Sequence, residues 1–201
     1  MRPRSRFVPW IVFALVAAAV VATDLWTKRA VFEFLRVESV GTPPRVARQV
    51  EYTVIPGFFD LQANYNYGAF SGWFSRHTGV LTFISIAALV ILAAFFAAQF
   101  RDGAAPPLAL TAAIALVWGG TLGNLYDRAT LGAVRDWVKW FVVWGGRERV
   151  WPNFNVADAS ISVGVSLWIL FELWLAPRAK RRGPTPSPSD RRSKGSSRSS
   201  R

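Results

Sequence analysis

The stretch HTGVLTFISIAALVILAAFFAAQF, residues 77–100, contains no Asp, Glu, Lys or Arg. The stretch GAAPPLALTAAIALVWGGTLGNLY, residues 103–126, is equally free of these charged residues. Both exceed the roughly 18 apolar residues that suggest a membrane-spanning helix. A soluble core of four helices would carry charged residues on every turn, so these two stretches predict helices that cross a bilayer.

Two further apolar stretches reach spanning length when the polar residues at their ends lie at the membrane interface. Residues 7–23 are followed by Asp24 and Lys28, and residues 159–171 are bounded by Asp158 and Glu172. A cleavable signal peptide is the alternative for the first stretch, but DLWTK continues it with helical spacing. The sequence therefore predicts an all-α polytopic membrane protein whose four transmembrane helices lie at about 7–28, 78–100, 105–124 and 156–176.

The net charge of +12 is spread unevenly along the chain. Residues 178–201 hold nine Lys/Arg and one Asp, whereas residues 1–177 are close to balanced. A soluble nucleic-acid-binding domain would carry its basic patch on a folded surface, so no nucleic-acid partner is expected. The segment 178–201 is predicted to be a disordered cytoplasmic tail that is attracted to anionic membrane lipid, beyond a membrane domain at 1–177.

The cysteine and histidine content excludes several kinds of site. The chain has no Cys, which excludes disulfides, zinc–thiolate sites and thiol nucleophiles. Its single histidine, His77, rules out a multi-histidine metal site within one chain. We therefore expect neither a metal nor an organic cofactor.

The distribution of positive charge predicts the orientation of the helices. Three arginines precede the first helix and the basic tail follows the fourth, so both termini are expected in the cytoplasm. The long loops 29–76 and 127–157 then lie outside. VEYTVIPGFFDLQANYNYG, residues 50–68, alternates apolar and polar residues around a Pro-Gly turn, which predicts a small β-containing extracytoplasmic surface element. The second loop carries three tryptophans that are predicted to anchor at the membrane interface, namely Trp137, Trp140 and Trp144.

Polar residues gather at the outer ends of all four predicted helices, and ionisable residues there are functional candidates. Each also has a purely structural explanation. Asp24 and Lys28 have the i, i+4 spacing of a helical ion pair. Asp127 next to Arg128 suits a solvated turn, and Asn155 with Asp158 suits a helix N-cap.

The expected proximity of two aspartates favours a catalytic role for them over a purely structural one. Asp136 follows the third helix, and Asp158 lies in the first turn of the fourth. Antiparallel packing of these helices would bring both carboxyl groups to one level. Two carboxyl groups in a partly desolvated cleft cannot both ionise cheaply, so one keeps its proton near neutral pH. Such a pair can deprotonate a water and protonate the carbonyl group that the water attacks.

Four motifs in series carry a family resemblance. DLWTK (24–28), IPGFFDLQANYNYGAFS (55–71), GNLYDRATLGAVRDW (123–137) and FNVADASISVG (154–164) together resemble the lipoprotein signal peptidases, also called signal peptidase II. The resemblance covers roughly residues 8–176. It implies that Asp136 and Asp158 are the catalytic pair of an aspartic protease. It further implies that substrate-binding or supporting roles belong to Asn66, Asn124, Arg128, Asn155, Asp24 and Lys28.

The resemblance also implies a function. A protein of this kind removes the signal peptide from diacylglyceryl-modified prolipoproteins and cuts before the lipidated cysteine. It would be a monomer in the bacterial inner membrane, with its active site at the extracytoplasmic face. Two other classes stay open: a small four-helix transporter, whose ionisable residues would spread through the membrane depth, and a structural membrane protein, which would tolerate Asp136→Asn.

Overall fold

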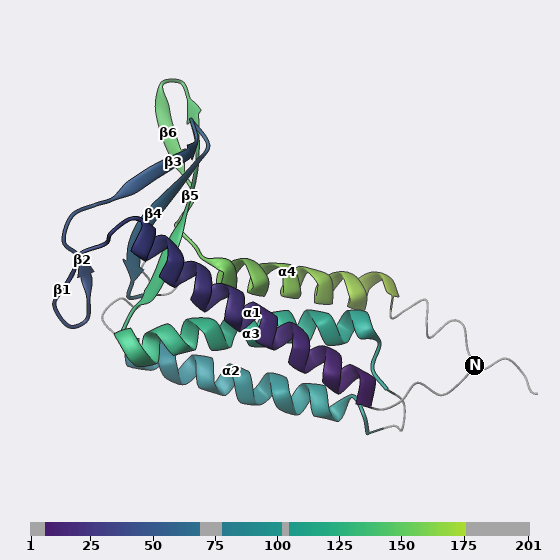
Figure 1. The fold of residues 1–201 in the computed structure, drawn as a ribbon. Helices are drawn as coiled ribbons and strands as arrows, with labels where there is room; N and C mark the ends of the chain where they lie inside the picture. Colours follow the sequence, from purple (N-terminus) through teal and green to yellow (C-terminus); the bar gives the residue numbers. More distant parts are fainter. Residues whose placement is uncertain (1–6, 69–77, 102–104, 176–201) are drawn as a thin grey trace, which may run out of the picture.

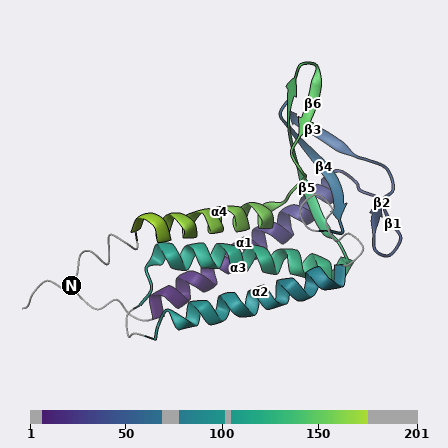
Figure 2. The same ribbon diagram turned by 180° about the vertical axis from the view of Figure 1, so that it is seen from behind.

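Four long helices form the body of the molecule. The computed structural model describes residues 7–68, 78–101 and 105–175. The helices are α1 (Phe7–Phe34), α2 (Thr78–Ala98), α3 (Leu108–Leu131) and α4 (Val156–Leu170), which continues as a π-helical turn, Phe171–Leu175. All four are long and apolar enough to cross a membrane. They lie side by side, and α1 begins and α4 ends at the same end of the bundle (Figures 1 and 2).

Two of the helices are longer than the sequence predicts. Helix α1 continues past Lys28 to Phe34, and α3 continues past Asn124 to Leu131. The polar residues at the expected ends are buried inside the bundle and bonded to other helices, so they do not end the helix. The predicted tail 178–201, the three N-terminal arginines and His77 lie outside the described residues.

Helix α3 is the centre of the bundle, and its glycines set how closely the neighbouring helices approach. A Cβ atom added to Gly119 would lie 2.9 Å from the carbonyl oxygen of Ala17 on α1. One added to Gly120 would lie 2.5 Å from the carbonyl oxygen of Ala157 on α4. Small residues allow such close backbone packing between membrane helices. The polar ends of α1 and α4 are therefore held against the same helix.

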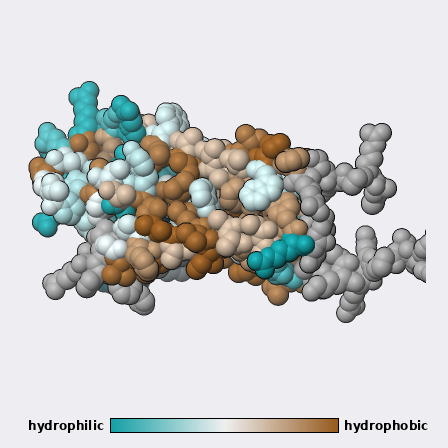
Figure 3. All heavy atoms as spheres, turned by 90° about the horizontal axis from the view of Figure 1, so that it is seen from below, coloured by the Kyte–Doolittle hydropathy of each residue, from teal (hydrophilic) through white to brown (hydrophobic). Residues whose placement is uncertain are grey.

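A four-stranded antiparallel sheet covers the end of the bundle at which α1 ends and α4 begins (Figure 1). Its strands lie in the order β3 (Glu51–Ile55), β4 (Phe59–Asn66), β5 (Val134–Trp144) and β6 (Arg147–Val150). A separate ribbon joins β1 (Ser39–Val40) to β2 (Arg45–Val46). Hydrophilic residues gather over the sheet end, and apolar ones cover much of the bundle (Figure 3).

The β part is larger than the small surface element that the sequence predicts, so an all-α description is too narrow. The β structure predicted around Pro56 and Gly57 is confirmed, and its two strands pair as the hairpin β3–β4; Gly57 has a left-handed φ of 75° in the turn. The β5–β6 hairpin was not predicted. It contains the three tryptophans predicted as interface anchors, and Trp137 packs on the cluster of Phe32, Leu35 and Ala63.

The end of α3 leads directly to the candidate site. Gly132 ends the helix with a left-handed φ of 73°, and its N–H bonds to the carbonyl oxygen of Arg128. This conformation favours glycine because it has no Cβ atom. The chain then enters β5, whose residue Asp136 pairs with Asn64 of β4. Strand β5 thus carries Asp136 back toward the start of α4.

Candidate active site

Asp136 from β5 and Asp158 from the first turn of α4 line the same cavity, which has a volume of about 520 Å³. Asn155 contacts both of them. Its side-chain amide donates to Asp136 Oδ1 over 2.7 Å, and its backbone N–H donates to Asp158 Oδ2 over 3.2 Å. Asn155 Oδ1 accepts from the backbone N–H of Asp158 in return, which confirms the predicted N-cap as a full capping box.

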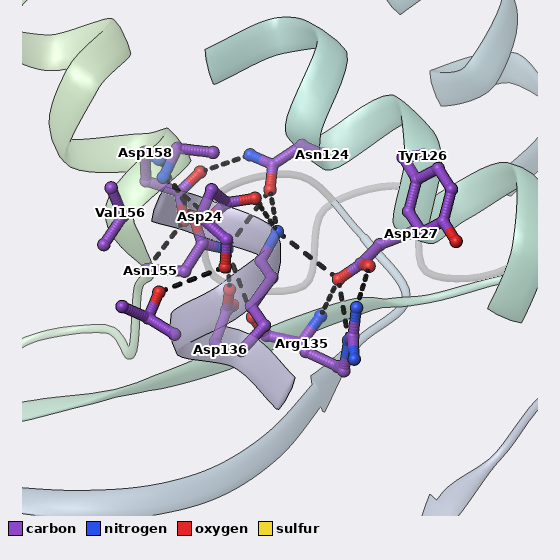
Figure 4. Close-up of polar contacts among 12 residues, drawn as sticks. Asp24, Asn124, Tyr126, Asp127, Arg135, Asp136, Asn155, Val156 and Asp158 are labelled. Atoms are coloured by element: carbon purple, nitrogen blue, oxygen red, sulfur yellow. Dashed lines mark hydrogen bonds and ion pairs between the residues drawn. The ribbon is translucent and has the colours of Figure 1, made fainter. Parts of the chain in front are cut away.

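Two more asparagines complete the bonding of the aspartates, and Figure 4 shows one of them, Asn124, beside Asp158. Asn66 Nδ2 donates to Asp136 Oδ2 over 3.0 Å, and Asn124 Nδ2 donates to Asp158 Oδ1 over 2.7 Å. Each carboxyl group therefore accepts one N–H at each of its oxygens. These bonds fix the direction in which both carboxyl groups face the cavity.

The surroundings of Asp136 favour its protonated form. The residue is only 1% exposed. Burial and, second, the neighbouring Asp158 carboxylate raise the pKa of Asp136 to about 8, against the opposing effect of the Asn66 hydrogen bond. At neutral pH Asp136 therefore holds a proton. This matches the sequence-based expectation that one member of the pair stays protonated.

Behind the aspartates lies a buried ionic network centred on Lys28. Its Nζ lies 2.7 Å from Asp24 Oδ2, which confirms the predicted i, i+4 pair, and 3.3 Å from Asp127 Oδ2. The same Nζ donates to Asn124 Oδ1 over 3.0 Å. Lys28 thus holds the asparagine whose other end binds Asp158. Buried charges require such compensation, since an unpaired one would be very costly.

The network also ties the start of α4 to α1. Asp24 Oδ1 accepts the backbone N–H of Ala157 over 2.9 Å, directly beside Asp158. Asp127 is fully buried, so its interpretation as a solvated turn is wrong. Its second cationic partner is Arg135, which approaches within 2.7 Å. The negative charges of Asp24 and Asp127 are compensated by the positive charges of Lys28 and Arg135.

Arg128 is placed differently from the other basic residues. It lines the cavity with the two aspartates, and its Nη2 lies 3.4 Å from the carbonyl oxygen of Gly68. Its Nε is buried and has no hydrogen-bond partner among the residues that the structure describes. A guanidinium with unused donors beside the aspartates can bind an oxygen atom of a ligand.

The structure brings together all eight residues that the sequence singles out, from α1, β4, α3, β5 and α4. Sequence reasoning missed Arg135, although a buried Asp127 needs a second cation. It also missed Trp140, which lines the cavity with Trp151 and Phe154. Within residues 7–68, 78–101 and 105–175, no group of three His, Cys, Asp or Glu is placed to hold a metal.

Comparisons with known proteins identify the family to which the chain belongs. The model of the signal peptidase (SPase) II family matches residues 16–174. A lipoprotein signal peptidase of Oleidesulfovibrio alaskensis is 38% identical over 165 residues, which cover 82% of this chain and 92% of that protein. One from a Sulfurihydrogenibium species is 31% identical over 170 residues, which cover 84% and 94%.

A solved bacterial membrane enzyme, determined at 2.3 Å resolution by the in meso method, has the same fold. It superimposes with a TM-score of 0.66 at 28% identity, covering 87% of this chain and 94% of that one. A second such structure, at 1.9 Å resolution, gives a TM-score of 0.60 at 29% identity, covering 81% and 92%. The chain therefore belongs to the signal peptidase II family, and it is a peptidase with four helices suited to span a membrane.

Proposed function

We propose that this protein is an aspartic endopeptidase of the bacterial inner membrane that removes the signal peptide from diacylglyceryl-modified prolipoproteins. The cut falls just before the lipidated cysteine. The observation that carries the proposal is the placement of Asp136 and Asp158 in one cavity, each held by two N–H donors. The relatives named lipoprotein signal peptidase support the choice of substrate.

The proposed reaction uses one shared proton. Asp136, with its pKa of about 8, enters the reaction protonated, and we assign the role of general base to Asp158. Asp158 takes a proton from a water whose oxygen bonds to the scissile carbonyl carbon, while Asp136 donates its proton to the carbonyl oxygen. The C–N bond of the resulting diol then breaks. Asp158 gives its proton to the leaving cysteine nitrogen while Asp136 takes a proton back from one diol hydroxyl, so the signal peptide gains a carboxyl group and the pair returns to its starting state.

The shape of the cavity fits a substrate that is part lipid and part peptide. Beyond Asp158 its wall is formed by Ile161 and Val163 of α4, which suit acyl chains. A second cavity of about 480 Å³ shares Asn66 and Asp136 with the first and is lined by amide side chains that suit a peptide backbone, those of Gln62, Asn64 and Asn153. Arg128 is positioned to bind a carbonyl oxygen of either part.

The proposed orientation places this site at the extracytoplasmic face, with a monomer crossing the membrane four times. The sheet lies at the bundle end away from the start of α1 and the end of α4 (Figure 1). Asp136 belongs to β5 of this sheet, and Asp158 lies in the first turn of α4. The basic residues of 178–201 favour the cytoplasm for that opposite end. A lipidated cysteine held in the outer leaflet would then lie at the depth of the two aspartates.

A matched pair of substrates tests the proposal. The purified protein in lipid nanodiscs is given one prolipoprotein with the diacylglyceryl group on its cysteine and the same chain without it. Mass spectrometry of the products locates the cut. We expect cleavage of the lipidated chain alone, directly before the cysteine. Cleavage at another bond, or equal cleavage of the unmodified chain, contradicts the proposal.

A further inference from the structure

The β5–β6 hairpin extends beyond the helical bundle on the side of α4, across the direction of the helices (Figures 1 and 2). Its tip is formed by Gly145 and Gly146, both with positive φ. With the four helices across a bilayer, a hairpin in this position lies along the membrane surface and not over the protein.

The two faces of this hairpin differ in composition. Side chains alternate along a strand, and residues directly opposite in an antiparallel pair share a face. Val142 pairs with Arg149, and Trp144 pairs with Arg147. We call these four residues the cavity-side face, because Asp136 and Trp140 occupy the same alternate positions of β5 and line the cavity. The opposite face carries Val143 paired with Glu148 and Phe141 paired with Val150, so it has no unpaired positive charge.

The cavity-side face combines exposed apolar groups with unbalanced positive charge. Trp144 is 78% exposed and Val142 is 50% exposed. Neither Arg147 nor Arg149 makes an ion pair within the described part of the chain, whereas Glu148 on the other face lies 3.9 Å from Lys139. Tryptophan and arginine together are typical of the membrane interface, where the indole ring and phosphate groups are both within reach.

We propose that the cavity-side face docks on the headgroups of acidic phospholipids beside α4. Val142 and Trp144 enter the interface, and Arg147 with Arg149 binds phosphate oxygens. Because Trp140 precedes Val142 on the same side of β5 and lines the cavity, the docked hairpin brings the lipid surface up to the cavity. A lipid-anchored ligand could then pass from the bilayer to the aspartates without crossing water.

Two single cysteines on neighbouring residues test the docking, since the chain has no cysteine of its own. Val142→Cys and Val143→Cys replace residues of similar exposure, 50% and 56%, on opposite faces. Each variant carries a polarity-sensitive fluorophore in nanodiscs that contain a phospholipid with a nitroxide headgroup. We expect blue-shifted emission and strong quenching at position 142, and water-like, weakly quenched emission at 143. Equal signals at both positions overturn the proposal.

The arginines are tested in the same labelled protein. Nanodiscs of phosphatidylcholine alone are compared with nanodiscs that also contain phosphatidylglycerol. The label at position 142 should be quenched more strongly in nanodiscs that contain the acidic lipid. The double change Arg147→Gln and Arg149→Gln should abolish this increase in quenching. The exposed Arg48, changed to Gln, is the control and should leave the increase in quenching intact. An increase that survives the double change, or is lost in the control as well, contradicts a headgroup site. No substrate is present, so the result is independent of the proposed cleavage.

Discussion

Asn155 donates its side-chain amide to the Asp136 carboxyl group over 2.7 Å while it also caps helix α4. The same residue therefore fixes where α4 begins and how the first aspartate faces the second. Capping and catalytic placement are not competing explanations for the polar start of this helix. The cap is the means by which Asp158 is held beside Asp136.

Changing Asn155 separates these two roles. Asn155→Ser keeps an oxygen that can cap the helix but is too short to reach Asp136, so cleavage should fall by roughly a hundredfold or more with little change in melting temperature. Asn155→Ala removes the cap as well and should cost about 1 kcal/mol of additional stability. Single-turnover cleavage and thermal unfolding in detergent measure the two effects. Full activity in Asn155→Ser would show that the amide of Asn155 does not position Asp136.

The rate of cleavage should depend on pH through Asp136. Its pKa of about 8 means that the proton required for attack on the carbonyl group is present at neutral pH and is lost above pH 8. We expect kcat/KM to fall by about tenfold per pH unit on the alkaline side. A profile that stays flat to pH 10, with the protein still folded, would remove Asp136 as the acid.

Asp136 should also make stability depend on pH. Its pKa is raised from 3.8 to about 8 by folding, so the folded protein keeps a proton that the unfolded chain releases between these values. The stability from this group is complete below about pH 4 and is lost as the pH rises through 8. Asp136→Asn should therefore melt higher than the parent protein at pH 9, by on the order of 5 °C, and differ least at pH 4. The exposed Glu33, changed to Gln, is the control and should show no such trend.

Removing Lys28 should unbalance the buried network. Lys28→Met leaves Asp24 and Asp127 without their shared cation, and a broken buried pair costs about 3–5 kcal/mol. The adjacent Arg29 forms a pair with Glu33 on the exposed surface, so Arg29→Met is the matched control and should melt like the parent protein. Equal melting temperatures for the two variants would mean that the network adds nothing to stability.

The glycines of α3 offer a steric test. A Cβ atom on Gly123 would lie 2.6 Å from Asp24 Oδ2, whereas one on Gly79 of α2 would meet nothing within 4 Å. Gly123→Ala should displace Asp24, release the N–H of Ala157 and lower both melting temperature and cleavage. Gly79→Ala should change neither. If both alanine variants behave alike, the close packing of α1 on α3 is not what holds the site.

The sequence predicts the helices, one buried ion pair and one helix cap because each depends on a local signal, whereas the roles of Asn66, Asn124 and Arg128 are implied only by the family resemblance. Apolar length predicts the spans, the spacing of Asp24 and Lys28 predicts their ion pair, and Asn155 with Asp158 predicts the cap. The β5–β6 hairpin was not predicted because β5 combines buried charged residues with apolar ones. Its sequence therefore shows neither the alternation of apolar and polar residues nor the continuous apolar run that predicts a strand. The role of Arg135 was not predicted because its partner Asp127 is buried only when α3 continues past Asn124. That burial depends on tertiary packing and has no local sequence signal.

The most direct test of the account is cleavage of a diacylglyceryl-modified prolipoprotein by Asp136→Asn and Asp158→Asn, each purified, folded and compared with the parent protein. Both changes keep the size of the side chain and remove the ability to exchange a proton. The account predicts that both variants lose cleavage by several orders of magnitude while they remain folded. Near-normal cleavage by either folded variant would contradict a catalytic pair of aspartates.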